Sequence, residues 1–400
     1  MKHTGLTIML ALLSMLGAWG IDAYLPSFQA IGVSLNASPV AVQQTLSAYI
    51  GAMAVTVLFA GTLSDTLGRR PVVLFATLLF AASSVWGVLA DDIDTLIMAR
   101  ALQGVAAGIA TVLSRTIVQD LFSGAEAQRV MSLITMVFSI APSVAPVVGG
   151  WLQKVFDWHA VFIMLALYGA LLWVLCQWGL RESLAPGHRV PMRLGVILRN
   201  YGRALTHVRF MLMAGSVSML FIGIALYVSS AAAFLIDVLK LTETDFAWMF
   251  IPMTTGMLLG ASAARRLARN VAPERLTAFG MGTALSAALI SVIYTQLSST
   301  PAVPWAVLPL GLYTFGMTFA LPSMTVTSLS VFPDMRGLAA SLQSFVQMAA
   351  FSLVSAFVAP QVFHSAQALA WTHLGGLLLG VGLWVLAARL PENTAACSTP

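Results

Sequence analysis

Long apolar stretches, uncharged or nearly so, recur along the whole chain and alternate with short polar segments. A helix needs about 20 such residues to cross about 30 Å of hydrocarbon. The pattern predicts twelve spans, placed to within several residues at 6–33, 41–63, 72–90, 95–118, 131–152, 159–179, 211–235, 246–264, 276–296, 304–328, 338–359 and 366–388. We therefore expect an all-α integral membrane protein.

The composition agrees with this prediction. The chain is 59% hydrophobic and only 9% charged, whereas soluble domains carry about 25% charged residues. The first apolar segment is too long, and at Asp22 too polar, for a cleaved signal peptide, so we expect it to remain as a helix. Neither a disulfide framework nor a metal site is predicted, because Cys176 and Cys397 are the only cysteines and the histidines show no paired ligand spacing.

Lysine and arginine are distributed unequally between the two sides of the predicted bundle. With the N-terminus inside, the outer loops hold only Lys154 and Lys240, and Arg100 lies within a span. The cytoplasmic side then holds Lys2, Arg69, Arg70, Arg115, Arg129, Arg181, Arg189, Arg193, Arg199, Arg203, Arg209, Arg265, Arg266, Arg269, Arg275, Arg336 and Arg389. This bias predicts that both termini are cytoplasmic. The net charge of +5 reflects this topology and gives no reason to expect nucleic-acid binding, since the basic residues are split among short loops.

The spans divide into six plus six. The longest polar stretch, residues 181–209, contains Pro186, Gly187 and Pro191 and lies almost at the middle of the chain. We interpret it as a cytoplasmic linker between an N-terminal six-helix bundle, residues 1–180, and a C-terminal one, residues 210–400. Transporters built from two related halves have this organisation, with the substrate site between the halves near the membrane midplane.

Asp22 is the only charged residue in the apolar stretch from Gly5 to Leu35. This position is near the middle of a predicted membrane helix. An acidic residue there is energetically costly and indicates a functional site by default. A carboxyl group in a low-dielectric environment is also cheaper to neutralise and reionise than to hold permanently charged. The placement therefore favours a protein that moves protons. The alternative is a structural role, in which Asp22 supports a helix break beside Pro26.

The loop after the second span carries the strongest motif. Residues 61–74 read Gly-Thr-Leu-Ser-Asp-Thr-Leu-Gly-Arg-Arg-Pro-Val-Val-Leu, and here the chain resembles the major facilitator superfamily. We expect Gly61 to permit close helix contact and Gly68 a tight turn. Asp65 is expected near the positive end of a helix from the other half, with Arg69 and Arg70 anchored at the cytoplasmic interface. The alternative is a charged turn that only obeys the positive-inside rule.

Three further segments narrow the resemblance to twelve-helix drug:proton antiporters, notably the bicyclomycin and chloramphenicol resistance family. Residues 21–26, Ile-Asp-Ala-Tyr-Leu-Pro, are similar to the first-helix signature of that branch. Residues 100–104, Arg-Ala-Leu-Gln-Gly, resemble a motif whose arginine is associated with proton coupling. Residues 141–150, Ala-Pro-Ser-Val-Ala-Pro-Val-Val-Gly-Gly, resemble the antiporter motif.

The sequence also departs from the family pattern. Ala145 stands where the wider superfamily has glycine, and Ser14 and Met15 occupy the region where some multidrug relatives carry a second acid. The second half does not repeat the 61–74 signature, because residues 260–269 keep glycine and arginines but lack the acid. An exchange mechanism with two acids is therefore not supported.

The fifth span has a mechanical interpretation that does not depend on the family. Pro142 and Pro146 each remove a backbone donor on one helix face, and Gly149 and Gly150 allow close approach, which favours a bent helix at a moving interface. The residues from Gly256 to Gly260 in the eighth span form a small-residue face that could be its partner, although glycine is common in membrane helices.

Arg100 is the expected electrostatic counterpart of Asp22, because both lie within spans of the first half. The alternative places Arg100 near the outer end of its helix with its charge reaching water. At the other end of the same helix, Arg115 and Asp120 are predicted to join the Asp65 loop in a charge network that holds the halves together when the inner side is closed.

The substrate is less well defined. Tyr24, Tyr49, Gln103, Tyr227 and Phe234 are candidate lining residues of a central cavity with few polar contacts. The preferred hypothesis is a monomeric, proton-driven exporter of lipophilic small molecules in a bacterial inner membrane. The second is a metabolite facilitator or proton symporter. The third is a membrane-embedded enzyme. The sequence shows neither a nucleophile paired with a general base nor a metal-ligand set near one interface. Because no ATP-binding loop is present, we expect the proton gradient to supply the energy, without a cofactor.

Overall fold

The computed structural model describes residues 3–184, 194–267, 270–298, 300–333 and 335–390. Several residues named above lie outside this described part: Lys2, Pro186, Gly187, Arg189, Pro191, Arg193, Arg269 and Cys397. All regular elements of the described residues are helical, as the sequence predicts.

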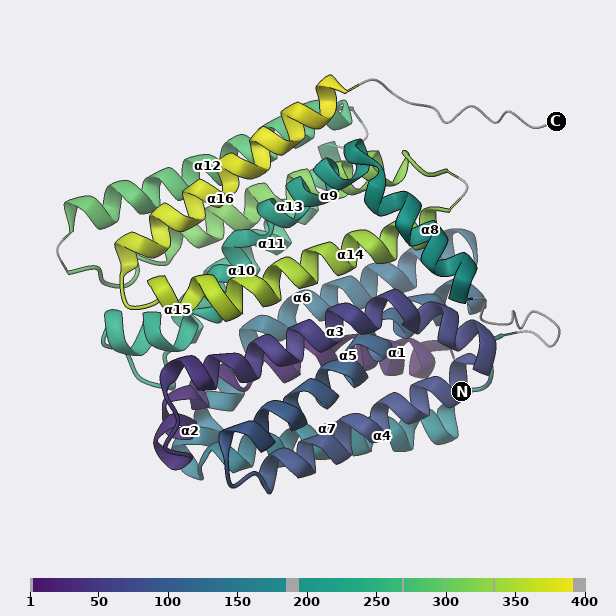
Figure 1. The fold of residues 1–400 in the computed structure, drawn as a ribbon, viewed down its shortest axis with the longest axis horizontal. Coiled ribbons are helices and arrows are strands. Elements are labelled where there is room, and N and C mark those ends of the chain that lie inside the picture. The colour runs from purple at the N-terminus through teal and green to yellow at the C-terminus, as the bar shows by residue number, and fades with distance from the viewer. Residues whose placement is uncertain (1–2, 185–193, 268–269, 299, 334, 391–400) are drawn as a thin grey trace.

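The first half runs from α1 to α7. Its elements are α1 (His3–Asp22), the short turn η1 (Leu25–Ser27), α2 (Phe28–Ser34), α3 (Pro39–Leu67), α4 (Arg69–Val88), α5 (Ile93–Leu121), α6 (Gly124–Val155) and α7 (Trp158–Gly179). The long helices lie side by side in the lower part of Figure 1.

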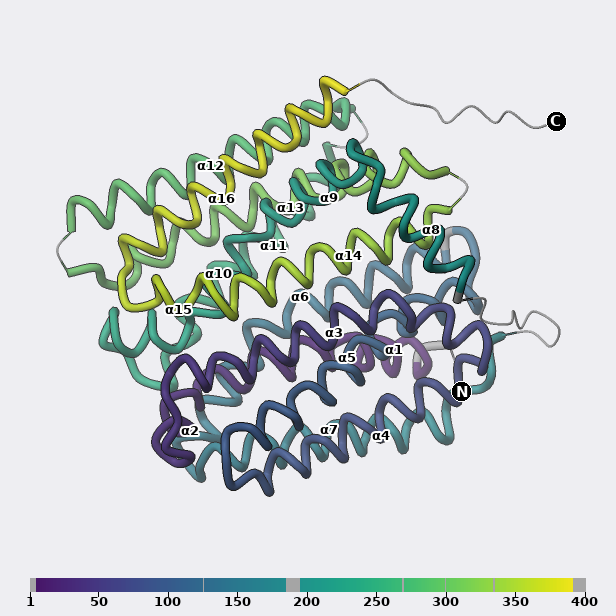
Figure 2. The backbone as a smooth tube through the Cα atoms, viewed as in Figure 1, coloured from purple at the N-terminus to yellow at the C-terminus, as the bar shows by residue number. Residues whose placement is uncertain are grey.

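The second half follows α8 (Leu194–Thr206) and forms the upper part of Figure 1. Its elements are α9 (Val208–Leu220), α10 (Ile222–Ser229), η2 (Ala233–Val238), α11 (Ala247–Leu267), α12 (Pro273–Leu297), α13 (Leu308–Leu329), α14 (Arg336–Leu353), η3 (Val354–Val358), α15 (Ala359–Val362) and α16 (Ala366–Arg389). The tube in Figure 2 shows that α1 begins, and α16 ends, at the same end of the bundle as α8. We call this the termini end.

Ten helical stretches of the described residues are long and apolar enough to cross a membrane, or eleven if the bent pair α9 and α10 counts as one span. The chain is therefore a multi-pass membrane protein. The remaining long helix, α13, has 22 residues and packs against α11 and α12. Twelve spans are consistent with this arrangement.

Three predicted spans are interrupted, the first by a residue within the span and the seventh beside a contact from another helix. The first breaks between α1 and α2 at a turn that contains Pro26, which has no backbone N–H to continue the helix. The seventh bends by 43° between α9 and α10. There the hydroxyl of Tyr313 donates to the carbonyl of Leu220 at 2.7 Å, replacing a helical bond. The eleventh passes through η3, a stretch of π-helix.

Helix starts at the end opposite the termini follow capping rules. Ser38 accepts a hydrogen bond from the amide of Ala41 at the start of α3, and Asp92 accepts one from Thr95 at the start of α5. Side-chain oxygens satisfy helix N–H groups that have no partner within the helix. The bonds from the backbone and hydroxyl of Thr95 lower the pKa of Asp92 below its usual range.

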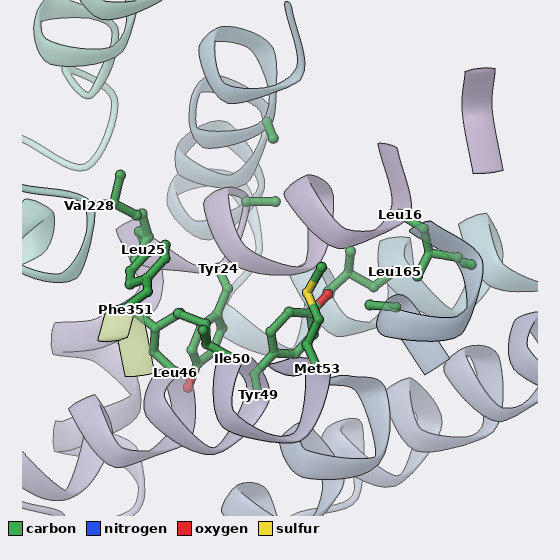
Figure 3. Packing of buried hydrophobic residues seen from close by; sticks show 14 of the residues in the cluster. Leu16, Tyr24, Leu25, Leu46, Tyr49, Ile50, Met53, Leu165, Val228 and Phe351 are labelled. Atoms are coloured by element: carbon green, nitrogen blue, oxygen red, sulfur yellow. The ribbon is translucent and has the colours of Figure 1, made fainter. Parts of the chain in front are cut away.

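The halves meet along two helix pairs, α3 with α14 and α6 with α11. Between α3 and the α14–η3 segment, Gln43 Nε2 donates to Ser355 Oγ at 2.8 Å, and Ser352 Oγ donates to the carbonyl of Ser47 at 2.9 Å. These bonds lie toward the end opposite the termini. Apolar packing joins the halves there too: one cluster contains Leu25 and Leu46 from the first half together with Val228 and Phe351 from the second (Figure 3).

The segment predicted as a polar linker contains the helix α8. Its Tyr201 donates from the hydroxyl to the carbonyl of Leu58 on α3 at 2.7 Å. Tyr201 also belongs to an apolar cluster with Phe210 and Phe332 of the second half. The linker helix therefore touches both halves at the termini end.

Candidate functional site

Asp22 is the last residue of α1 and stands at the interruption of the first span. Its side chain is buried, at 5% exposure, and no ion pair to it occurs among the described residues. The C-terminal end of a helix carries partial negative charge, which does not favour a carboxylate. Holding the charged form here is therefore costly. Both interpretations of the sequence agree with this placement, because the acid is intramembrane and also lies at a helix break.

Helix α6, which contains residues 141–150, packs directly on this break. A Cβ atom at Gly149 would collide with the backbone carbonyl of Ala23, the residue after Asp22. Glycine is required at this contact because the obstacle is backbone and cannot rotate away. The close approach predicted for residues 149–150 is therefore present at Gly149, and it fixes α6 against the segment that carries Asp22.

Arg100 is fully buried on α5 between two tyrosine rings. Its Cζ lies 4.4 Å from the ring centroid of Tyr24 and 4.3 Å from that of Tyr49. Its Nη1 donates to Gln103 Oε1 at 2.7 Å, and Gln103 Nε2 donates to Ser84 Oγ at 2.7 Å. Cation–π contacts on two faces stabilise a buried guanidinium. The alternative in which Arg100 reaches water does not hold.

The tyrosine rings are themselves fixed. The hydroxyls of Tyr24 and Thr45 are 2.8 Å apart, and Tyr49 donates to the carbonyl of Gly17 at 3.1 Å. Gly104, one turn after Arg100, has no room for a side chain because a Cβ would meet the carbonyl of Tyr49. Gly104 thus lets α5 pack closely on α3. Arg100, four residues earlier on α5, then lies between the two rings. Figure 3 shows Tyr24 and Tyr49 near each other among the buried hydrophobic residues.

Asp22 and Arg100 form no ion pair in this conformation. The predicted counterparts lie in the same half, but the arginine is held by the two rings and by Gln103 rather than by the acid. Arg100 Nε and Nη2 have no hydrogen-bond partner among the described residues. A direct Asp22–Arg100 interaction is therefore not part of this state.

The 61–74 motif forms a charge network at the termini end. Gly68 has a φ of 103°, which only glycine adopts easily, and makes the predicted tight turn between α3 and α4. Arg69 pairs with Asp65 and, through Nε, with Asp120 Oδ2 at 2.9 Å. Its Nη1 also donates to Ser64 Oγ at 2.6 Å. The network joins α3, α4 and α5.

Glu182, which the sequence analysis did not select, completes this corner. Its carboxylate accepts the backbone N–H groups of Arg69 at 2.9 Å and Arg70 at 3.2 Å. It thus caps the start of α4, where a negative charge is favourable. Arg70 donates to the carbonyls of Leu180 and Gln177 at the end of α7. No sequence motif contains Glu182. Its role depends on the fold, which brings the segment after α7 to the start of α4.

One prediction about the motif is wrong for this conformation. Gly61 makes no close helix contact, since its Cβ position has nothing within 4 Å. Asp65 pairs with Arg69 of its own half, and its expected position near a helix of the other half stays a prediction. Arg115 takes no part in the ion pairs of the described residues. The ion pairs of the network therefore join helices of the first half. The role of the network in holding the halves together concerns the state with a closed inner side and stays a prediction.

Helix α6 does contact the second half, but through a different surface of α11 from the one predicted. Ser143 Oγ donates to the carbonyl of Phe250 on α11 at 3.2 Å. A Cβ at Gly150 would meet the backbone carbonyl of Glu243, just before α11. Gly256 and Gly260 instead pack on α13, so their predicted pairing with α6 is wrong. Pro142 and Pro146 lie within one continuous helix.

The five candidate substrate residues are all buried. Tyr24, Tyr49 and Gln103 are 0% exposed and belong to the Arg100 cluster. Tyr227 packs edge-on against Phe234 and against His373 inside the second half. None of the five lines the cavity of about 420 Å³ between the halves. His373 is a further buried polar residue, and neither ring nitrogen has a partner among the described residues.

Comparison with known proteins agrees with this architecture. The family model "Major Facilitator Superfamily" matches residues 8–355. The Bicyclomycin resistance protein homolog of Haemophilus influenzae is 29% identical over 91% of both chains. Multidrug resistance protein D of Escherichia coli is 26% identical over 98% of both. The crystal structure of a D-xylose-proton symporter superposes with a TM-score of 0.74 over 98% of this chain and 99% of its own, at 16% identity.

The helical bundle and these similarities define a multi-pass membrane transporter rather than an enzyme. The chain belongs to the Major Facilitator Superfamily. This confirms the fold class and the family resemblance drawn from residues 61–74.

Proposed function

We propose that this chain is a proton-coupled antiporter that exports lipophilic small molecules, antibiotics among them, across the bacterial inner membrane by alternating access. The observation that carries the proposal is Asp22, a buried carboxyl group without an ion-pair partner among the described residues, at the break between α1 and α2. Keeping such a group permanently charged costs more free energy than letting it take up and release a proton. The printed names of the relatives, bicyclomycin and multidrug resistance, supply the substrate class.

In this proposal the termini end faces the cytoplasm. The network around Arg69 and Arg70 lies at that end, in line with the positive-inside rule. The bonds from Gln43 and Ser352 between the halves then close the outer side. With this orientation, the proposal assigns the state described here as inward-facing. The transporter functions as a monomer made of two halves, residues 1–180 and 210–400, joined by the 181–209 linker, and needs the proton gradient but no cofactor.

The test is transport into inverted membrane vesicles with a panel of labelled drugs, with and without a proton uncoupler. Export predicts uptake into these vesicles that the uncoupler abolishes. The competing function is a metabolite facilitator or proton symporter of the same fold. A symporter predicts that protons move in the same direction as the added substrate, and a facilitator predicts no coupled proton movement. Proton flow in the same direction as the substrate would contradict antiport.

The Asp65→Asn variant is expected to slow turnover by about tenfold, corresponding to about 1.4 kcal/mol in the barrier, with little change in substrate affinity. The reason is that Asp65 orients Arg69 at the termini end, whereas Asp22 is the last residue of α1, which begins at that end. Equilibrium drug binding and initial transport rates separate the two quantities. Asp94→Asn, at the opposite end of the bundle, is the matched control. A large loss of affinity at normal turnover would place Asp65 in the binding site instead.

A further inference from the structure

A cavity of about 420 Å³ lies between the halves at the end opposite the termini. This volume is within the range of small-molecule sites. The first half contributes Phe28, Gln29 and Gln43 to its wall, and the second half contributes Ser229, Asp237 and Phe363. We call it the outer vestibule. It is separate from the Asp22 and Arg100 region, since neither residue lines it.

The chemistry of the outer vestibule is that of a site for a monocation with an apolar body. Asp237 is the only ionisable residue among the described residues that line it, and no ion pair to it occurs among them. The nearby Lys240 is exposed and does not line the cavity. Phe28 and Phe363 offer ring surface from opposite halves. A carboxylate and aromatic rings together favour a cation over a neutral or anionic molecule.

Polar groups in the outer vestibule are arranged to hold a ligand. Gln29 Nε2 donates to Asp237 Oδ1 at 2.7 Å across the two halves. The Gln43 side chain, which also lines the cavity, is held in place by its hydrogen bond to Ser355.

We propose that the outer vestibule binds a singly charged amphipathic cation from the external solution and, when occupied, holds the outer ends of the two halves together. This rests on the proposed orientation of the transporter. A ligand that contacts both halves stabilises the closed state relative to the open one. The ratio of closed to open molecules rises by a factor of 1 + [L]/Kd, about tenfold at ten times Kd. External cations of this class therefore slow export.

The binding test uses benzyltrimethylammonium and the full-length protein in phosphatidylglycerol nanodiscs. Asp237→Asn is expected to weaken binding by about fivefold, the upper end for an ion pair open to water. Ala233→Phe, which fills the cavity from its wall, weakens binding without a charge change. Asp22→Asn and the surface control Asp91→Asn leave binding unchanged. Loss of binding in Asp22→Asn alone, or in none of the variants, would overturn the proposal.

The transport test adds the same cation to right-side-out vesicles. At the same cation concentration, export by the wild type and by Asp91→Asn slows more than export by Asp237→Asn and Ala233→Phe. Equal inhibition of all four proteins would contradict the effect of the outer vestibule on transport. Because binding is measured without a gradient, Asp237-dependent binding in a protein that moves no protons would refute only the proposed antiport. Proton-coupled export without such binding would refute only the outer vestibule site.

Discussion

The Asp22→Asn variant is expected to fold and to lose proton-coupled transport entirely. Asparagine has almost the same volume as aspartate, so packing at the end of α1 against Gly149 is kept. The amide cannot take up or release a proton at neutral pH, and no other acid is present between Gly5 and Leu35. Drug-driven proton release by the purified variant in weakly buffered detergent solution measures the effect directly.

Controls separate the loss of a titrating group from damage to the helix break. Asp22→Glu keeps a carboxyl group and is expected to retain proton release at a reduced rate, because the longer side chain fits less well in a buried site. Thermal unfolding of the Asn variant should match that of the wild type. If the Asn variant releases protons on drug addition as the wild type does, Asp22 has only the structural role beside Pro26.

The membrane fold could be predicted from the sequence because the bilayer leaves few choices. An apolar stretch of about 20 residues must satisfy its own backbone, so it forms a helix. Local signals also worked where the cause is local. Pro26 interrupts the first span, and Gly68 adopts the positive φ of a tight turn. The break between α9 and α10 was not visible, because it depends on the hydroxyl of Tyr313, about 90 residues away.

The candidate site was predictable as a set of residues but not as a geometry. Arg100, Tyr24 and Tyr49 were each selected from the sequence, yet their roles depend on how α1, α3 and α5 are rotated. Helix rotation also explains the glycine predictions. Gly149 meets a neighbouring backbone, whereas Gly61 faces open space. Glycine is common in membrane helices. The spacing of glycines in the sequence therefore does not show which neighbouring helix, if any, each of them faces.

The Gly150→Leu variant is expected to shift the transporter toward the outward-open state and to slow transport, although Asp22 is unchanged. Gly150 lies where α6 of the first half meets the backbone of Glu243 in the second, and a side chain there would strike that carbonyl. The obstacle is main chain, so the halves must separate to relieve the contact. Added bulk at a packed contact costs about 1–3 kcal/mol, enough to change a two-state ratio by roughly tenfold or more.

Gly282→Leu is the matched control, because the same substitution on α12 meets nothing within 4 Å. A cysteine at position 355 reports on the outer side. Ser355 is fully buried between the halves, so a water-soluble thiol reagent reaches it only when they part. In a background without Cys176 and Cys397, Gly150→Leu should raise its labelling rate and Gly282→Leu should not. If labelling and transport are the same in both variants, the contact at Glu243 does not seal the outer side, and α6 is not the element that couples closure to transport.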